Sequence, residues 1–180
     1  LAQMDIERIE VLRGPQGTLY GRNSNGGAVN FISRAPTAEP EGYIRVGFAE
    51  YDEFKIAGAY SAPLSERTAL RIAFDHTESN EGWIENLSPG FDDPMQGKNT
   101  SARLRLTSQL TDEFELGLIY ENNSSDGLLS HGAFLTDNRE LASPEIGLAN
   151  ITLEPLKTYS TIDSDFERDY ELFSVTVSWD

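Results

Sequence analysis

Apolar and polar residues alternate one by one through much of the sequence after residue 42. In residues 42–51 large apolar side chains alternate with small or charged ones, so that the two sides of an extended chain carry Ile44, Val46 and Phe48 against Arg45, Gly47 and Ala49. The same alternation recurs in residues 53–62, 68–77, 100–110, 113–122 and 170–179. A period of two predicts β-strands, and segments of about ten residues have the length of a tilted membrane strand. We therefore predict a mainly β chain with about six antiparallel strands.

The connections between these strands alternate in length. Residues 63–67 and 110–113 are short turns, whereas residues 78–99 and 124–168 are long connections. Outer-membrane β-barrels have short periplasmic turns and long external loops. The sequence thus predicts that the two long connections are external and that the two short turns face the periplasm.

The polar side of the predicted strands carries charged residues mixed with glycine and alanine. The charged positions are Arg45, Lys55, Arg71, Asp75, Arg103, Arg105, Glu115 and Glu121. This composition suits the polar lumen of a barrel, but an antiparallel soluble sheet with one wet face has the same alternation. Aromatic residues near strand ends fit an interfacial girdle, although strand propensity alone also places aromatics there; they are Tyr43, Tyr51, Tyr60, Tyr120 and Trp179.

A glycine-rich stretch, "GPQGTLYGRNSNGGAVNFI", occupies residues 14–32. This stretch does not match a phosphate-binding loop. A Walker motif needs a lysine, and no lysine precedes Lys55; a dinucleotide-binding motif needs the G-x-G-x-x-G spacing, which these glycines lack. The flanking runs "DIERIEVLRG" and "AVNFISRAP" are rich in strand-forming residues. The pattern therefore predicts two strands joined by a glycine-rich connection.

The run "IERIEVLRGPQGTLYGRNSNGGAVNFISRAP" closely resembles the end of the plug domain of TonB-dependent outer-membrane receptors. In that family an E-R-I-E-V-[LV]-[RK]-G-P run leads through Y-G to a G-G-A-[VI]-N-[FI]-I strand. The resemblance implies that residues 1–34 are the C-terminal part of a plug domain. Residues 35–42, "APTAEPEG", are then a linker, and residues 43–180 are the N-terminal strands of a transmembrane β-barrel. On this interpretation the chain is a fragment, which fits its start without methionine and its end in a strand-like run.

Composition excludes several other classes of protein. The chain has no cysteine, only two histidines and no run of eighteen apolar residues, so the sequence predicts neither a metal site nor a transmembrane helix. Its net charge of −16 disfavours binding to nucleic acid. We find no catalytic constellation and expect neither an enzyme nor a cofactor. The remaining rivals are a passive porin or adhesin barrel, and an enzyme on a soluble β-sandwich.

The family resemblance also implies a function and a location. Such receptors lie in the bacterial outer membrane, contact its lipid, and import scarce solutes with energy supplied by the TonB complex. A ferric siderophore is the expected solute, with a carbohydrate or another nutrient as the alternative. The TonB complex would bind through a segment that is not in this chain.

Two groups of site residues follow from the resemblance. The segment between Y-G and G-G-A forms the external apex of the plug in this family, which implies solute contacts from Arg22, Asn23, Ser24 and Asn25. Plug arginines in the family contact barrel glutamates, which implies the same role for Arg8 and Arg13.

Overall fold

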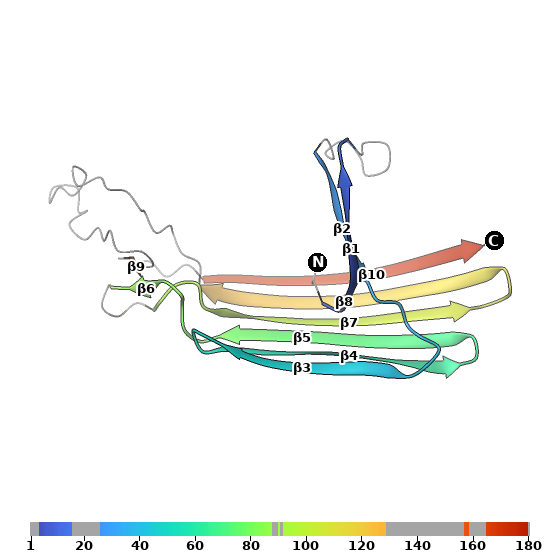
Figure 1. Ribbon diagram of the computed structural model, residues 1–180, viewed down its shortest axis with the longest axis horizontal. Helices are drawn as coiled ribbons and strands as arrows, with labels where there is room; N and C mark the ends of the chain where they lie inside the picture. Colours follow the sequence, from blue (N-terminus) through green and yellow to red (C-terminus); the bar gives the residue numbers. More distant parts are fainter. Residues whose placement is uncertain are drawn as a thin grey trace.

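The computed structural model describes residues 4–15, 26–87, 90, 92–128, 157–158 and 165–179. Its largest element is a six-stranded antiparallel sheet with the order β10-β8-β7-β5-β4-β3 (Figure 1). The strands are β3 (Glu41–Ala49), β4 (Glu53–Ser65), β5 (Thr68–Ser79), β7 (Gly97–Gln109), β8 (Phe114–Leu128) and β10 (Asp165–Trp179). The six strands predicted from the alternating pattern are therefore confirmed, and sequential strands are neighbours throughout.

Several strands extend further than the apolar alternation predicted. β8 continues to Leu128 and β10 begins at Asp165, so the long connection between them is shorter at both ends than residues 124–168. The added part of β8, residues 123–128, is made of polar residues and glycine apart from Leu128. Its strand conformation comes from the continuous backbone ladder between β8 and β10, in which Asp165 pairs with Leu128 and Trp179 with Phe114.

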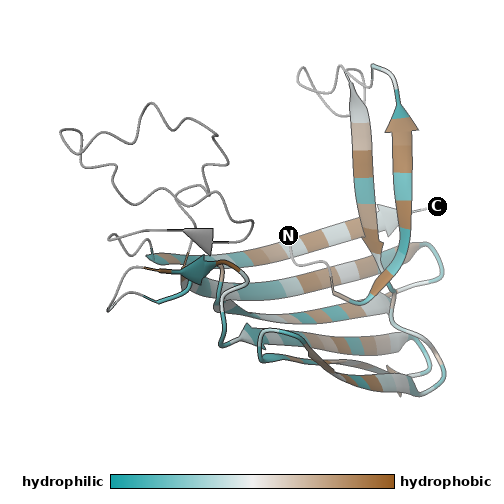
Figure 2. Ribbon diagram, turned by 60° about the vertical axis from the view of Figure 1, so that its left-hand side comes forward, coloured by the Kyte–Doolittle hydropathy of each residue, from teal (hydrophilic) through white to brown (hydrophobic). Residues whose placement is uncertain are grey.

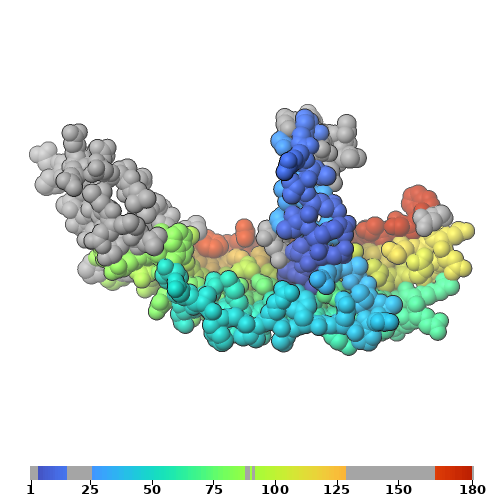
Figure 3. All heavy atoms as spheres, viewed as in Figure 1, coloured from blue at the N-terminus to red at the C-terminus, as the bar shows by residue number. Residues whose placement is uncertain are grey.

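A separate hairpin stands on one face of the sheet (Figures 1 and 3). It consists of β1 (Ile6–Arg13) and β2 (Gly27–Ser33), paired antiparallel. Gly27 has a φ of 124°, and a Cβ there would overlap the Leu12 carbonyl oxygen. One glycine of the predicted glycine-rich connection is thus required for the close approach of the two strands.

The two faces of the large sheet differ in chemistry. We call the face that carries the hairpin the inner face and the opposite one the outer face; the alternating hydropathy along the strands is visible in Figure 2. The outer face exposes large apolar side chains on every strand, among them Ile44, Phe48, Ile72, Leu104, Tyr120, Phe173 and Trp179. An exposed apolar surface of this extent is typical of a face that contacts lipid or another protein.

The predicted aromatic girdle is only partly supported. Tyr60, Tyr120 and Trp179 lie on the outer face and are 53%, 42% and 73% exposed. Tyr43 instead lies on the inner face, where it packs against a small cluster of Met4, Ala59 and Ala73. The prediction for Tyr43 was wrong because it ignored parity: Tyr43 is one residue from Ile44 and therefore points to the opposite face.

The two long connections carry one further pairing. β6 (Glu85–Asn86) and β9 (Lys157–Thr158) form a short parallel ladder between the two long connections. Among the residues that the structure describes, no helix has the length and apolar character needed to cross a membrane.

Candidate functional site

The hairpin meets the inner face of the sheet at three arginines. Arg71 lies on β5, directly opposite Arg105 of β7 in the strand register, and Arg103 is two residues before Arg105. Like charges opposite one another destabilise a sheet unless they are compensated. The base of the hairpin supplies an acceptor to each of the three guanidinium groups.

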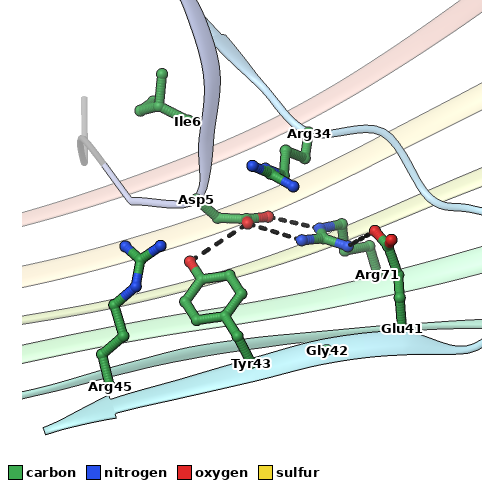
Figure 4. A pocket seen from close by; sticks show the side chains of 8 residues that line it. All are labelled: Asp5, Ile6, Arg34, Glu41, Gly42, Tyr43, Arg45 and Arg71. Atoms are coloured by element: carbon green, nitrogen blue, oxygen red, sulfur yellow. Dashed lines mark hydrogen bonds and ion pairs between the residues drawn. The ribbon is translucent and has the colours of Figure 1, made fainter.

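Asp5 forms the strongest of these contacts. Its carboxylate accepts two hydrogen bonds from Arg71, at 2.6 Å from Nε to Oδ2 and 2.8 Å from Nη2 to Oδ1. Both side chains are only 3% exposed, and the remaining Arg71 nitrogen, Nη1, donates to Glu41 at 3.0 Å. The Tyr43 hydroxyl also donates to Asp5, at 3.4 Å (Figure 4). A bidentate, charge-assisted pair of this kind fixes both distance and orientation.

The backbone of Asp5 supports the same arrangement. Its φ of 48° lies in the left-handed region, which aspartate tolerates better than most residues. Its carbonyl oxygen accepts a hydrogen bond from the Arg34 amide at 3.1 Å, and this bond closes the base of the hairpin. The turn at Asp5 thus directs the carboxylate toward the sheet while β1 leaves it.

Arg103 and Arg105 bind main-chain oxygens on both sides of the hairpin base. Arg103 Nη1 donates to the Met4 carbonyl at 2.8 Å, and Arg105 Nη1 donates to the Ser33 carbonyl at 2.9 Å. Arg103 also pairs with Glu121 of β8, with 2.7 Å from Nε to Oε2 and exposed fractions of 8% and 2%. Side chains of the inner face therefore bind the hairpin base at both ends, just before the chain enters β1 and at the last residue of β2.

The segment that follows the hairpin is fixed as well. The Thr37 amide donates to Ser61 Oγ at 2.8 Å, and the Ser61 hydroxyl donates to the Leu70 carbonyl at 3.2 Å. Ser61 is completely buried. Residues 35–42, predicted as a linker, thus include one residue, Thr37, that is hydrogen-bonded to the inner face of the sheet.

A cleft of about 440 Å³ opens beside the Asp5–Arg71 pair. Arg34 and Arg45 line it with Asp5, and the Arg45 guanidinium stacks over the Tyr43 ring at 4.5 Å from the ring centroid (Figure 4). Its lining is ionic and hydrogen-bonded rather than nucleophilic. In the described part of the chain, no group of three or more His, Cys, Asp or Glu residues is arranged to hold a metal ion.

The site residues predicted from the sequence lie elsewhere. Arg22, Asn23, Ser24 and Asn25 fall outside the described residues. Arg8 pairs with Glu7 and Glu10 of its own strand, both at 2.8 Å, and is exposed. The hydrogen bond and charge of Glu10, together with Glu7, raise the pKa of Arg8 above its ordinary value. Contacts of Arg8 and Arg13 with barrel glutamates stay a prediction.

The sequence pattern does not predict Asp5 as a site residue. The inner-face positions of Arg71, Arg103, Arg105 and Glu121 were predicted from the alternation, and the register confirms that they share this face. Asp5 lies 66 residues before its partner, and nothing in the local pattern distinguishes it from a solvated residue before a strand.

Comparison with known proteins agrees with this architecture. Residues 2–28 match the TonB-dependent Receptor Plug Domain family model. The chain is 33% identical over 92 residues to the pesticin receptor of Yersinia pestis, covering 51% of this chain and 14% of that protein. It is 30% identical over 145 residues to the ferric enterobactin receptor of Pseudomonas aeruginosa, covering 68% of this chain and 19% of that protein.

A solved structure shares the fold over nearly the whole chain. The ferric yersiniabactin uptake receptor FyuA from Yersinia pestis superimposes with a TM-score of 0.77 at 20% identity, covering 98% of this chain and 26% of that one. The chain thus spans between about a seventh and a quarter of the length of these proteins. The plug-domain match, the relatives and the shared fold together show that the chain belongs to the TonB-dependent receptors of the bacterial outer membrane and carries plug sequence followed by strands of the β-barrel.

Proposed function

We propose that the complete receptor imports a ferric siderophore across the outer membrane with energy transduced by the TonB complex. The observation that carries this proposal is the plug hairpin bound to the polar inner wall of a sheet whose outer face is apolar. A gated transporter needs a plug that is held in its barrel, for example by buried ion pairs. A passive pore does not. The siderophore is suggested by the ferric enterobactin receptor among the relatives.

Uptake of radioactive iron in a receptor deletion strain tests the proposal. The strain complemented with the complete receptor should accumulate iron from a panel of ferric siderophores that includes ferric enterobactin and ferric yersiniabactin. Loss of the same uptake in a TonB-deficient background is expected. Uptake that persists without TonB would instead indicate a passive pore, and failure with every ferric siderophore would exclude this solute class.

The plug apex is proposed as part of the solute site. Arg22, Asn23, Ser24 and Asn25 supply a cation and several hydrogen-bonding groups suited to carboxylates or hydroxyls. Changing Arg22, Asn23 and Asn25 together to alanine should weaken solute binding while the barrel still assembles. One hydrogen bond to a charged group contributes roughly 1.5–3 kcal/mol, so the dissociation constant should rise about tenfold or more. An unchanged dissociation constant would remove these residues from the site.

The orientation of the barrel strands is proposed from the loop lengths, with the outer face in contact with outer-membrane lipid. Asp92 lies in the long connection between β5 and β7, and Glu66 lies in the tight turn between β4 and β5; both are exposed. In the complete receptor, Asp92→Cys should react with a membrane-impermeant thiol reagent on intact cells. Glu66→Cys is the matched control and should react only after the outer membrane is permeabilised. The reverse pattern would invert the assignment.

A further inference from the structure

We infer that the cleft beside the Asp5–Arg71 pair is a binding site for an anionic group of the solute, on the inner face of the barrel. The inference deepens the proposed function, on which it rests, because it narrows the solute class to ferric siderophores that carry negative charge. It depends on two arginines of the cleft, Arg34 and Arg45, whose side chains do not take part in holding the hairpin.

The charged residues that line the cleft leave an excess of positive charge. Three of them are arginines and two are carboxylates, namely Arg34, Arg45, Arg71, Asp5 and Glu41. Arg71 binds both carboxylates, at 2.6 Å to Asp5 and 3.0 Å to Glu41. The two acidic groups of the cleft are thus already engaged with one arginine, and the charges of the other two arginines remain to be balanced.

Arg34 and Arg45 differ from the arginines that hold the hairpin. Arg71 and Arg103 are 3% and 8% exposed, and each pairs with a carboxylate. Arg34 and Arg45 are both exposed, and neither forms an ion pair within the part of the chain that the structure describes. The Arg45 guanidinium lies over the Tyr43 ring, a contact that orients it without using its N–H donors. The donors of both side chains are therefore available to a ligand.

The cleft lies at the depth of the lipid-facing side chains. On β3, Arg45 alternates with Ile44 and Val46, which are 68% and 55% exposed on the outer face. On β5, Arg71 precedes Ile72, which is 49% exposed on the same face. Charged residues at membrane depth face the interior of a membrane protein, where they mark the path of a charged solute. The cleft thus lies between the two mouths of the barrel, where a solute passes after it leaves the external side.

The size and donors of the cleft indicate the chemistry of its ligand. A volume of about 440 Å³ lies within the range of small-molecule sites. Figure 4 shows Arg45 extending into this space from β3 and Arg34 from the segment that follows the hairpin. Guanidinium groups donate paired hydrogen bonds to oxyanions. The ligand that fits is therefore a carboxylate or another oxyanion on the surface of a ferric complex.

Selenate, an oxyanion that anomalous diffraction locates, tests the site without any siderophore. Crystals of the complete receptor soaked in selenate should show the anion bound to the Arg34 and Arg45 guanidinium groups. The double variant Arg34→Gln, Arg45→Gln should lose this anion and keep any selenate bound elsewhere. A cleft without selenate would overturn the inference, as would carboxylates of the receptor itself seated on both guanidinium groups.

Iron uptake in the receptor deletion strain tests the solute class. The panel of ferric siderophores is sorted by charge, with ferric enterobactin as an anionic complex and ferrichrome as an uncharged one. The wild type should import an anionic member of the panel, and the double variant should import it at least about tenfold more slowly, because hydrogen bonds to a charged group are lost. Binding of the same complex to TonB-deficient cells should stay unchanged, since the cleft lies below the external side.

A matched control removes the same charge elsewhere. Arg67→Gln breaks an exposed pair with Asp112 in the short turns and should leave uptake at the wild-type rate. The double variant should also still exclude a large glycopeptide antibiotic, as a receptor with a seated plug does. Loss of that exclusion would show that the two arginines hold the plug, and it would overturn their assignment to the solute.

The two experiments separate failure of the inference from failure of the proposed function. A wild type that imports no ferric siderophore refutes the proposed function, and selenate binding still decides whether the cleft binds anions. Import confined to uncharged complexes, or equal uptake by the wild type and the double variant, overturns the assignment of an anionic solute.

Discussion

The Asp5→Ala variant of the complete receptor is expected to hold its plug loosely and to admit large antibiotics that the wild type excludes. The change removes both Asp5 hydrogen bonds to Arg71, a side chain that is 3% exposed and keeps Glu41 as its remaining carboxylate partner. Breaking a buried pair by removing one partner costs about 3–5 kcal/mol. A cost of about 3 kcal/mol raises the population of the detached plug roughly a hundredfold.

Sensitivity of cells to a large glycopeptide antibiotic measures this effect. Glu10→Ala is a matched control on the same hairpin, because Glu10 also pairs with an arginine at 2.8 Å but the Arg8 and Glu10 side chains are 54% and 39% exposed. Exposed pairs contribute about 0–1 kcal/mol, so the control should retain the wild-type barrier. Equal sensitivity of the two variants would contradict a special role for the buried pair.

The six barrel strands were predictable because lipid contact selects an apolar residue at every second position. This alternation stops after Tyr120 on β8, because residues 121–127 are polar or glycine on both faces. The sequence pattern therefore did not predict how far β8 and β10 extend. Those ends are set by the continuous ladder that pairs Asp165 with Leu128. Local pattern therefore determines the existence of these strands, and pairing with neighbours determines where they end.

The plug contacts were less accessible to sequence reasoning. The alternation predicted that Arg71, Arg103 and Arg105 share the inner face, but it contained no information on how the hairpin sits on that face. The contact between Asp5 and Arg71 joins residues 66 positions apart and depends on the orientation of the whole hairpin. Family resemblance directed attention to Arg8, which in this structure pairs with carboxylates of its own strand. In the Asp5–Arg71 pair the charges are placed the other way round: the plug provides the carboxylate, and the inner face of the sheet provides the arginine.

The largest expected effect on barrel stability is that of Glu121→Ala. Glu121 is 2% exposed, and its Oε2 atom lies 2.7 Å from Nε of Arg103, which is 8% exposed. Removing the carboxylate leaves a buried guanidinium without this ion pair, at an expected cost of about 3–5 kcal/mol. The urea concentration that unfolds half of the receptor, read from the mobility of unheated samples on gels, should fall accordingly.

Two controls separate burial from ion pairing as the cause of that loss. Asp112→Ala removes a pair of the same kind, Arg67 with Asp112 at 2.8 Å, whose side chains are 55% and 89% exposed. It should change stability by about 0–1 kcal/mol, because solvent screens exposed pairs. Combining Arg103→Met with Glu121→Met should recover much of the lost stability, since apolar side chains of similar volume replace buried ion pairs at little cost. Equal losses in Glu121→Ala and Asp112→Ala, or no recovery in the double variant, would show that the cost of Glu121→Ala does not come from breaking the buried Arg103–Glu121 pair.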